Sequence, residues 1–158
     1  MAVIITPWNA PLMLATWKLG PALAAGNTVI VKPPEWAPLT SSLLADCADA
    51  AGLPPGVFNI VQGTGAMTGA RRVSDPRLAR VSFTGSVPTA KWIAQAAGAN
   101  LVPCSLELGG KSPFIVLADA DIDNAAATGA LMYRNAGQVC LAGTRFLVHS
   151  AIAEPFIA

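Results

Sequence analysis

Cys140 is set apart by the small residues that surround it in the sequence. It lies in the segment RNAGQVCLAGTR, residues 134–145, which is rich in glycine and alanine. Most free cysteines are small buried hydrophobes, but no apolar periodicity runs through this segment. A thiolate that attacks a substrate needs room for the substrate to approach, and small neighbours leave that room. The pattern alone leaves a nucleophile and a buried filler equally open.

Glu107 is a carboxylate near the end of the apolar run LVPCSLEL, residues 101–108. In a strand, the side-chain period of two puts Glu107 on the face opposite Cys104 and Leu106. The two glycines that follow leave space for a ligand. Glu107 is therefore either a general base whose pKa is raised by apolar surroundings, or a strand-end carboxylate that pairs with a lysine such as Lys111.

Polar residues also follow two other predicted strands. Asn9 comes after the strand at 2–6, where open α/β sheets bind their ligands, and a neutral amide there can donate to a developing oxyanion. A turn asparagine between prolines is just as compatible. Lys32 lies at the end of the strand at 27–33 and Glu35 follows it, in reach of a ribose or a phosphate, although on their own they form only a charged loop.

Two glycine turns are weaker signals. GTGAMTG, residues 63–69, has one residue too many for the GxGxxG fingerprint. FTGS, residues 83–86, leads into a predicted helix whose first backbone N–H groups suit a phosphate. His149, the only histidine, follows Cys140 in a predicted strand that carries it away at about 3.3 Å per residue, which argues against a Cys–His hydrolase.

The composition excludes several classes of protein. Apolar residues make up 53% of the 158 residues and charged residues 12%, against about 25% in ordinary soluble domains, so we expect the chain to be part of a larger body. The net charge is +1 without a basic stripe, which argues against nucleic-acid binding. Pro7 and Pro11 interrupt the first apolar stretch, so neither a signal peptide nor a membrane span is expected. The cysteines lack metal-ligand spacing, which predicts no metal, no disulfide framework and a reduced, cytoplasmic setting.

Strand-like and helix-like segments alternate along the chain, and apolar strands in such alternation predict an α/β fold with an open parallel sheet and helices on both faces. Pro21 is expected to kink or divide the first helix. The glycine-rich segment LGGKSP, residues 108–113, is the expected domain boundary. The expected strands are 2–6, 27–33, 57–62, 79–85, 101–108, 113–117 and 144–150, and the expected helices are 11–26, 40–52, 66–73, 88–98 and one within 119–137.

Taken together, the motifs resemble the aldehyde dehydrogenase superfamily, in its order and near its spacing across essentially the whole chain. The resemblance implies a Rossmann-like fold, with part of an NAD-binding domain at 1–108 and the truncated start of a catalytic domain at 109–158. It implies that both ends belong to a longer subunit. The matching motifs are PWNAP (7–11), GNTVIVKPPEWAPLT (26–40), GLPPGVFNIVQGTG (52–65), SFTGS (82–86), LELGGKSPFIV (106–116) and GQVCLAGTR (137–145).

The resemblance also implies a role for each reactive residue. Cys140 matches the nucleophile, whose thiolate attacks an aldehyde to give a thiohemiacetal and then, after hydride transfer to NAD, a thioester. The Asn9 amide and the Cys140 backbone N–H would hold the oxyanion. Glu107 matches the general base that activates water to release the acid, and its presence favours hydrolysis over transfer to coenzyme A.

The cofactor residues are implied in the same way. Lys32 and Glu35 match positions that bind the adenine ribose, and Glu35 favours NAD over NADP. Many members of the family have a glycine where this chain has Ala90, and Pro88 is also unusual, so helix packing near the pyrophosphate is expected to differ. Further matching cofactor contacts are Trp8, Gly65, Gly69, Gly85, Ser86 and Leu108.

The implied protein is a cytoplasmic, homo-oligomeric oxidoreductase that converts an aldehyde to a carboxylic acid. Residues 7–40 look most similar to members that act on hydroxymuconic semialdehydes. Two alternatives are an NAD-binding module that does not turn over and an inert, aggregation-prone fragment. Because segments of the family are missing, little or no turnover is expected from these 158 residues alone.

Overall fold

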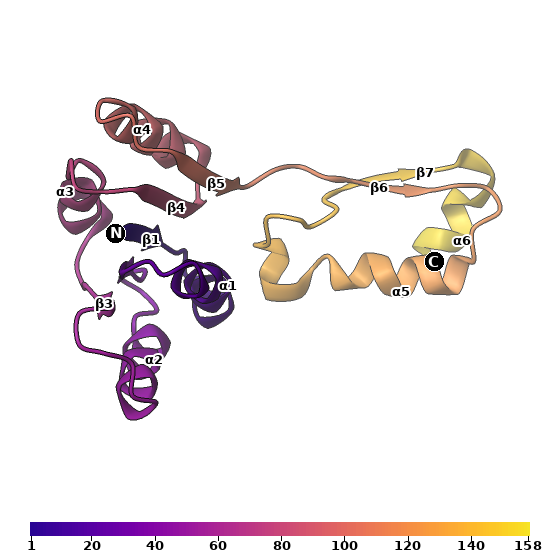
Figure 1. Ribbon diagram of the computed structural model, residues 1–158. Helices are drawn as coiled ribbons and strands as arrows, with labels where there is room; N and C mark the ends of the chain where they lie inside the picture. The colour runs from indigo at the N-terminus through magenta and orange to yellow at the C-terminus, as the bar shows by residue number, and fades with distance from the viewer. The chain divides into compact units, whose positions relative to one another are not determined.

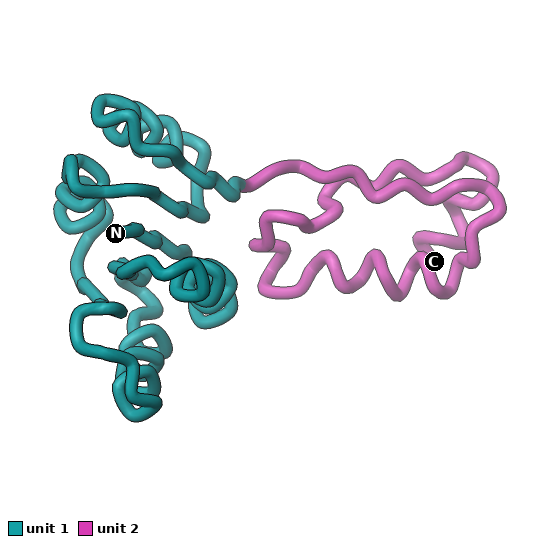
Figure 2. Tube along the Cα trace, in the orientation of Figure 1, with its two compact units in different colours: residues 1–108 teal, residues 109–158 magenta.

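The computed structural model describes all 158 residues, which form two compact units, Met1–Leu108 and Gly109–Ala158 (Figure 2). Unit 1 holds a five-stranded sheet and unit 2 a two-stranded sheet. The identification of unit 1 as a cofactor domain and of unit 2 as a catalytic domain stays a prediction.

The sheet of unit 1 is parallel throughout and has the strand order β3-β2-β1-β4-β5 (Figure 1). β1 is its central strand and is buried along its whole length, as an apolar strand in a covered parallel sheet should be. The strands are β1 (Ala2–Ile5), β2 (Val29–Lys32), β3 (Phe58–Ile60), β4 (Arg80–Gly85) and β5 (Cys104–Leu108).

Helices cover both faces of this sheet, so the predicted fold class is confirmed. On one face α1 packs on β1 and β2, while α2 packs on β3; on the other face α4 packs on β4 and β5. The helices are α1 (Pro11–Ala24), α2 (Leu39–Ala50), α3 (Ala70–Val73), which continues the π-helical segment η1 (Gly65–Gly69), and α4 (Val87–Gly98).

Side chains that alternate along the strands pack into two separate apolar cores, one on each face of the sheet. Val3 and Ile5 point to one face, where they meet residues of α3 and α4, and Ile4 points to the other, where it meets Leu19 of α1. Leu106 of β5 also packs on the first core, which leaves Glu107 on the opposite face, as its position in the strand predicts.

Two details of the helices differ from expectation. Pro21 does not divide α1, which runs unbroken to Ala24, because a proline so close to the helix end removes only one intrahelical hydrogen bond. The apolar pattern of residues 40–52 also predicts that Cys47 lies on the apolar face of that helix, α2, but its side chain is exposed. Gly26 and Gly52 do follow the ends of α1 and α2, with φ of 75° and 79°, a conformation that favours glycine.

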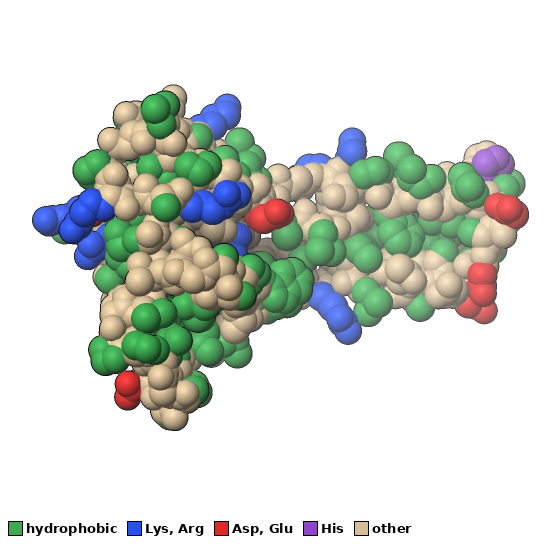
Figure 3. Space-filling model, viewed as in Figure 1, with side chains coloured by type: hydrophobic (Ala, Val, Ile, Leu, Met, Phe, Trp, Pro, Cys, Tyr) green, Lys and Arg blue, Asp and Glu red, His purple; other side chains and the backbone are tan.

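Unit 2 is a parallel pair of strands backed by helices. The elements are β6 (Pro113–Val116), β7 (Arg145–Val148), α5 (Ile122–Leu131) and α6 (Ala153–Ile157). Phe146 of β7 packs beside Gly129 of α5 and lies 6.1 Å, ring to ring, from Phe156 of α6. The other face of the pair is apolar and exposed (Figure 3). Ile115 and Leu147, direct neighbours across the two strands, are 62% and 55% exposed, although parallel sheets are usually covered on both faces.

None of the helices is both long enough and apolar enough to cross a membrane.

Candidate functional site

Most of the predicted site residues of unit 1 lie at the carboxyl edge of its sheet. Ile5, Lys32 and Phe83 are Cα partners on adjacent strands, so the segments that follow them leave the sheet side by side. Gly85 pairs with Leu108 at the same edge. The chain leaves β1 toward β2 on one side and β4 lies on the other, so this edge contains the point where the strand order reverses, which is where open α/β sheets bind ligands.

Glu35 joins the loop after β2 to the glycine turn before η1. Its Oε2 lies 3.1 Å from Nζ of Lys32, and its Oε1 accepts a 2.6 Å hydrogen bond from the backbone N–H of Gly65. Burial raises the pKa of the Glu35 carboxyl, but hydrogen bonds from the N–H groups of Glu35 and Gly65, together with Lys32, outweigh it and hold that pKa below its ordinary value. Glu35 is therefore a fixed negative charge at neutral pH.

The glycine turn GTGAMTG is held by its own threonines. Thr64 caps η1, where its hydroxyl accepts from the N–H of Met67, and the Thr68 hydroxyl donates to the carbonyl of Gln62. Gly63 has a φ of 130°, and a Cβ there would overlap the Thr68 hydroxyl. A glycine is thus required at this position for the turn to close, which explains the motif without the GxGxxG spacing.

The second glycine turn, FTGS, leads directly into α4. Ser86 is the N-cap, and its hydroxyl accepts from the N–H of Thr89 at 3.4 Å. A Cβ on Gly85 would overlap the ring of Phe83, so only glycine fits. Ala90, expected to alter the packing near this turn, is 2% exposed and belongs to the core shared with β4.

A pocket of about 520 Å³ opens between the two glycine turns and their helices. Its wall is largely apolar and carries the indole of Trp92, which is 44% exposed. Small residues on the η1 side keep it open for a flat group. The lining residues are Gly65, Ala66, Ala70, Pro88, Thr89 and Trp92.

Glu107 is exposed and faces the side of the sheet that carries α1. Its negative charge acts on Lys18 of α1. The Lys18 ammonium donates a hydrogen bond to the Ser82 hydroxyl at 3.1 Å. Burial lowers the pKa of Lys18, and the negative charge of Glu107 offsets part of that shift.

Cys140 lies in a loop of unit 2 and is exposed, which does not fit a buried filler. The loop is anchored on both sides of the thiol. The N–H of Ala142 donates to the carbonyl of Val139, and the N–H of Gly143 donates to the sulfur of Met132 at 3.1 Å. A Cβ on Gly143 would lie 2.9 Å from Cβ of Phe114, so the small residues after Cys140 let the loop pack closely on β6.

A left-handed turn connects α5 to the Cys140 loop. Asn135, Ala136 and Gly137 have φ of 52°, 55° and 72°. Asparagine and glycine tolerate this conformation, but for alanine it costs about 1–2 kcal/mol. The strain therefore sits on Ala136, four residues before the thiol.

The variant Ala136→Gly is expected to raise the free energy of unfolding by about 1 kcal/mol, because the relief of strain exceeds the entropy that glycine adds to the unfolded chain. Denaturant unfolding measures the change. Ala127→Gly, in the exposed middle of α5, is the matched control and should lower stability by about 1 kcal/mol. Equal destabilisation by both variants would show that Ala136 is not strained.

His149 has a structural partner of its own. It precedes a short helical turn at Ser150–Ile152, and its Nδ1 accepts from the N–H of Ala151 at 3.2 Å. The chain contains no group of three or more histidine, cysteine or acidic residues placed to hold a metal ion.

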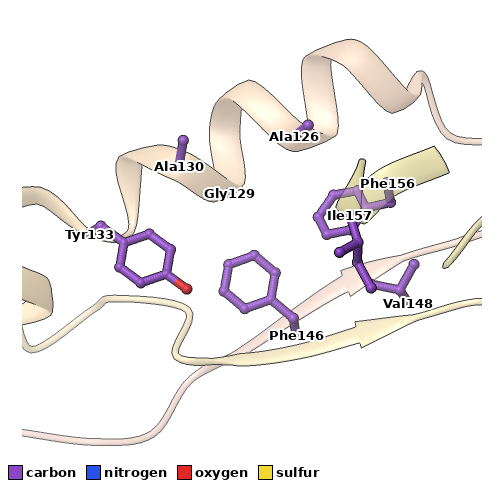
Figure 4. Close-up of a pocket in the computed structure, with 8 residues that line it drawn as sticks. All are labelled: Ala126, Gly129, Ala130, Tyr133, Phe146, Val148, Phe156 and Ile157. Atoms are coloured by element: carbon purple, nitrogen blue, oxygen red, sulfur yellow. The ribbon is translucent and has the colours of Figure 1, made fainter. Parts of the chain in front are cut away.

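Unit 2 also contains a cavity of about 680 Å³ between α5, β7 and α6 (Figure 4). Phe146, Tyr133 and Phe156 project into it, and small residues of α5 form the opposite wall. No acid, amine or thiol lines it, so it offers no group for the predicted chemistry.

Sequence reasoning did not single out Lys18 or Trp92. A lone charge in the apolar segment 11–26 was a usable signal for Lys18, because burying an amine on a sheet requires a polar partner such as Ser82. Trp92 had no such signal, since its role at a pocket depends on how η1 and α4 come together.

The family model described as "Aldehyde dehydrogenase family" matches residues 1–158. Phenylacetaldehyde dehydrogenase of Pseudomonas fluorescens is 51% identical over 154 residues, which cover 97% of this chain and 31% of the relative. Human 2-aminomuconic semialdehyde dehydrogenase is 47% identical over 158 residues, 99% of this chain and 32% of the relative. The chain thus spans about a third of the length of these relatives.

Solved structures agree. 3,6-Anhydro-L-galactose dehydrogenase in complex with NAP superposes with a TM-score of 0.95 at 45% identity, over 99% of this chain and 33% of that one. A C291A mutant of aldehyde dehydrogenase C from Pseudomonas syringae, in complex with NAD+ and octanal, gives 0.94 at 44% identity, over 98% and 32%. Fold, motifs and both comparisons lead to one conclusion: the chain belongs to the aldehyde dehydrogenase family.

Proposed function

We propose that the protein oxidises an aldehyde to a carboxylic acid with NAD, and that this chain carries the reacting residues. The observation that carries the proposal is the convergence of Asn9, Lys32, Glu35 and the two glycine turns on the carboxyl edge at the point where the strand order reverses. Relatives of the family that act on phenylacetaldehyde and on 2-aminomuconic semialdehyde support an aldehyde as the substrate.

The residues at this edge fit a dinucleotide. The N-terminus of α4 after Ser86 suits a pyrophosphate, and the pocket beside Trp92 is wide and apolar enough for an adenine ring. Glu35 is placed to accept from a ribose, and its fixed charge opposes a 2′-phosphate, which favours NAD. Trp8, Gly69 and Leu108 are proposed as further contacts.

The proposed mechanism assigns one task to each reacting residue. The Cys140 thiolate bonds to the aldehyde carbon, and the Asn9 amide and the Cys140 N–H donate to the oxygen that becomes negative. The residues at the carboxyl edge would hold NAD, which would supply the hydride acceptor, and Cys140 would then carry the acyl group as a thioester. Glu107 takes a proton from the water that attacks the thioester, so the acid leaves and the thiolate returns.

Because little turnover is expected from the 158 residues alone, the test is aldehyde-dependent reduction of NAD by a purified protein that carries these residues within a subunit of the length of the relatives. Octanal and phenylacetaldehyde are the substrates, and mass spectrometry identifies the acid. NAD binding is measured separately by calorimetry. Turnover with acid formation supports the proposal. Binding without turnover would instead identify an NAD-binding module, and the absence of both would overturn the proposal.

Asn9→Ala is expected to lower kcat about 100- to 1,000-fold while the KM for NAD changes little, because a lost oxyanion donor weakens only the transition state. Steady-state kinetics measures both constants. Asn124→Ala, exposed on α5, is the control and should leave kcat unchanged. A rise in KM alone for Asn9→Ala would place Asn9 in substrate binding rather than in oxyanion stabilisation.

Glu35→Gln is expected to raise the ratio of kcat/KM for NADP to that for NAD about tenfold or more, since it removes a charge that repels the 2′-phosphate but retains an acceptor for the Gly65 N–H. Asp46→Asn, exposed on α2, changes the net charge equally and should leave the ratio unchanged. If both variants moved the ratio alike, the effect would belong to net charge and not to Glu35.

A further inference from the structure

A second pocket of unit 1 lies on the face of the sheet that α1 covers. It has a volume of about 340 Å³ and lies between α1 and the strands β1, β4 and β5. Ala2 and Arg80 are the first residues of their strands, and Asn27 precedes β2, so the pocket extends toward the amino ends of the strands, away from the carboxyl edge. Its polar lining consists of Lys18, Asn27, Arg80, Ser82 and Ser105.

Two cations are fixed in this pocket by two neighbouring hydroxyls. The ammonium of Lys18 donates to Ser82 Oγ at 3.1 Å, and Nη2 of Arg80 donates to Ser105 Oγ at 2.6 Å. Ser82 and Ser105 are Cα partners on β4 and β5, so their hydroxyls rise from adjacent strands about 4.8 Å apart on one face. Both positive groups therefore line the same pocket.

The hydrogen bonds leave a surplus of donors. Both hydroxyl oxygens already accept from a cation, so their O–H groups remain to donate, together with the other N–H groups of Lys18 and Arg80. The Asn27 amide nitrogen donates to the carbonyl of Ala22, which leaves its side-chain oxygen as the main acceptor of the polar lining. A donor-rich, acceptor-poor pocket suits an oxyanion.

No carboxylate of the chain neutralises these cations. Neither Lys18 nor Arg80 forms an ion pair, and no acidic residue lines the pocket. Glu107 lies on the same face of β5, two residues beyond Ser105 toward the carboxyl edge, and it acts on Lys18 only through its charge. Burial lowers the pKa of Lys18, and the charge of Glu107 offsets part of that shift.

The opposite wall of the pocket is apolar. Ile4, Pro21 and the indole of Trp17 form it, and Trp17 is 66% exposed. We propose that this pocket binds a small organic carboxylate, with the carboxylate between Lys18 and Arg80 and a flat apolar body against Trp17. The site is separate from the proposed dinucleotide site, so the two proposals succeed or fail independently.

The test is equilibrium dialysis of the purified protein with radiolabelled benzoate. Saturable binding is expected, and Lys18→Met and Arg80→Met should each weaken it about tenfold or more, because each removes a charge-assisted donor. Lys91→Met, exposed on α4 at the other face of the sheet, is the matched control and should leave benzoate affinity unchanged. NAD affinity should be the same in all four proteins.

Two further ligands separate the contribution of the two cations from that of the apolar wall. Benzyl alcohol, which has the same ring without charge, should bind at least tenfold more weakly than benzoate if the cations act, and inorganic phosphate should bind more weakly than benzoate if the apolar wall acts. Far-UV circular dichroism verifies folding. If Lys18→Met unfolds, benzoate affinity is compared between Arg80→Met and Arg80→Lys, because Arg80 is exposed and both variants should fold. No saturable benzoate binding below about 10 mM, or binding that neither substitution weakens, would overturn the proposal.

Discussion

Replacing Cys140 with serine is expected to lower kcat by about four orders of magnitude or more, with NAD affinity unchanged. The serine hydroxyl is not ionised near neutral pH, whereas a thiol is partly thiolate and intrinsically more nucleophilic. The exposure of Cys140 and the close packing of the loop that carries it leave no role for the thiol in a core. Spectrophotometric detection of the reduced cofactor, with saturating NAD and aldehyde, measures the loss.

Cys47→Ser is the matched control, because Cys47 is also exposed but lies on α2 of unit 1. Its activity should stay within about twofold of the parent, as expected for a surface substitution. An equal loss in the two variants would point to oxidation or unfolding, and residual activity above about 1% in Cys140→Ser would exclude Cys140 as the nucleophile.

Glu107→Gln is expected to separate the two halves of the reaction. Steady-state turnover should fall about 100- to 10,000-fold, since water is no longer activated, while a rapid burst of reduced cofactor precedes the slow phase. The thioester on Cys140 then accumulates and is detected as an acyl adduct by mass spectrometry of the intact protein. Rapid-mixing kinetics measures the burst.

Two comparisons make this experiment specific to Glu107. Glu154→Gln, exposed on α6, should behave like the parent protein. Hydroxylamine attacks thioesters without a general base, so it should restore turnover in Glu107→Gln. Loss of the burst would assign Glu107 to a step before hydride transfer. A burst without an acyl adduct would show that the acid is released without Glu107.

Much of the fold could be predicted because local patterns and tertiary structure agree. Apolar runs such as AVII became buried strands, and glycines at 26 and 52 followed the helix ends where the chain turns left-handed. Pro21 does not divide its helix, because a local rule cannot tell how near the helix end lies. Cys47 was predicted wrongly, because a local rule cannot tell which part of a helix face a neighbour covers. The strands also came out shorter than the apolar runs that predicted them, as with Phe58–Ile60.

The candidate site was predictable in its residues but not in its interactions. The positions of Asn9 after β1 and of Lys32 at the end of β2 followed from the βα alternation. The hydrogen bond from Gly65 to Glu35 did not, because it joins segments that are 30 residues apart and meet only when β2 and β3 pair. The donor-rich pocket around Lys18 and Arg80 likewise depends on the register of β4 and β5.

The position of β1 at the centre of the sheet has a consequence for synthesis on the ribosome. β1 emerges before either of its partners, and β4 follows only at Arg80–Gly85. β2 can pair with β1 once Val29–Lys32 has been made, but the edge of β1 that pairs with β4 must wait while some 80 residues are added, which takes several seconds at about 5–20 residues per second. Over that interval the apolar segment AVII stays accessible on the nascent chain. A chaperone that binds this segment during synthesis should therefore raise the yield of folded protein more than one that acts after release.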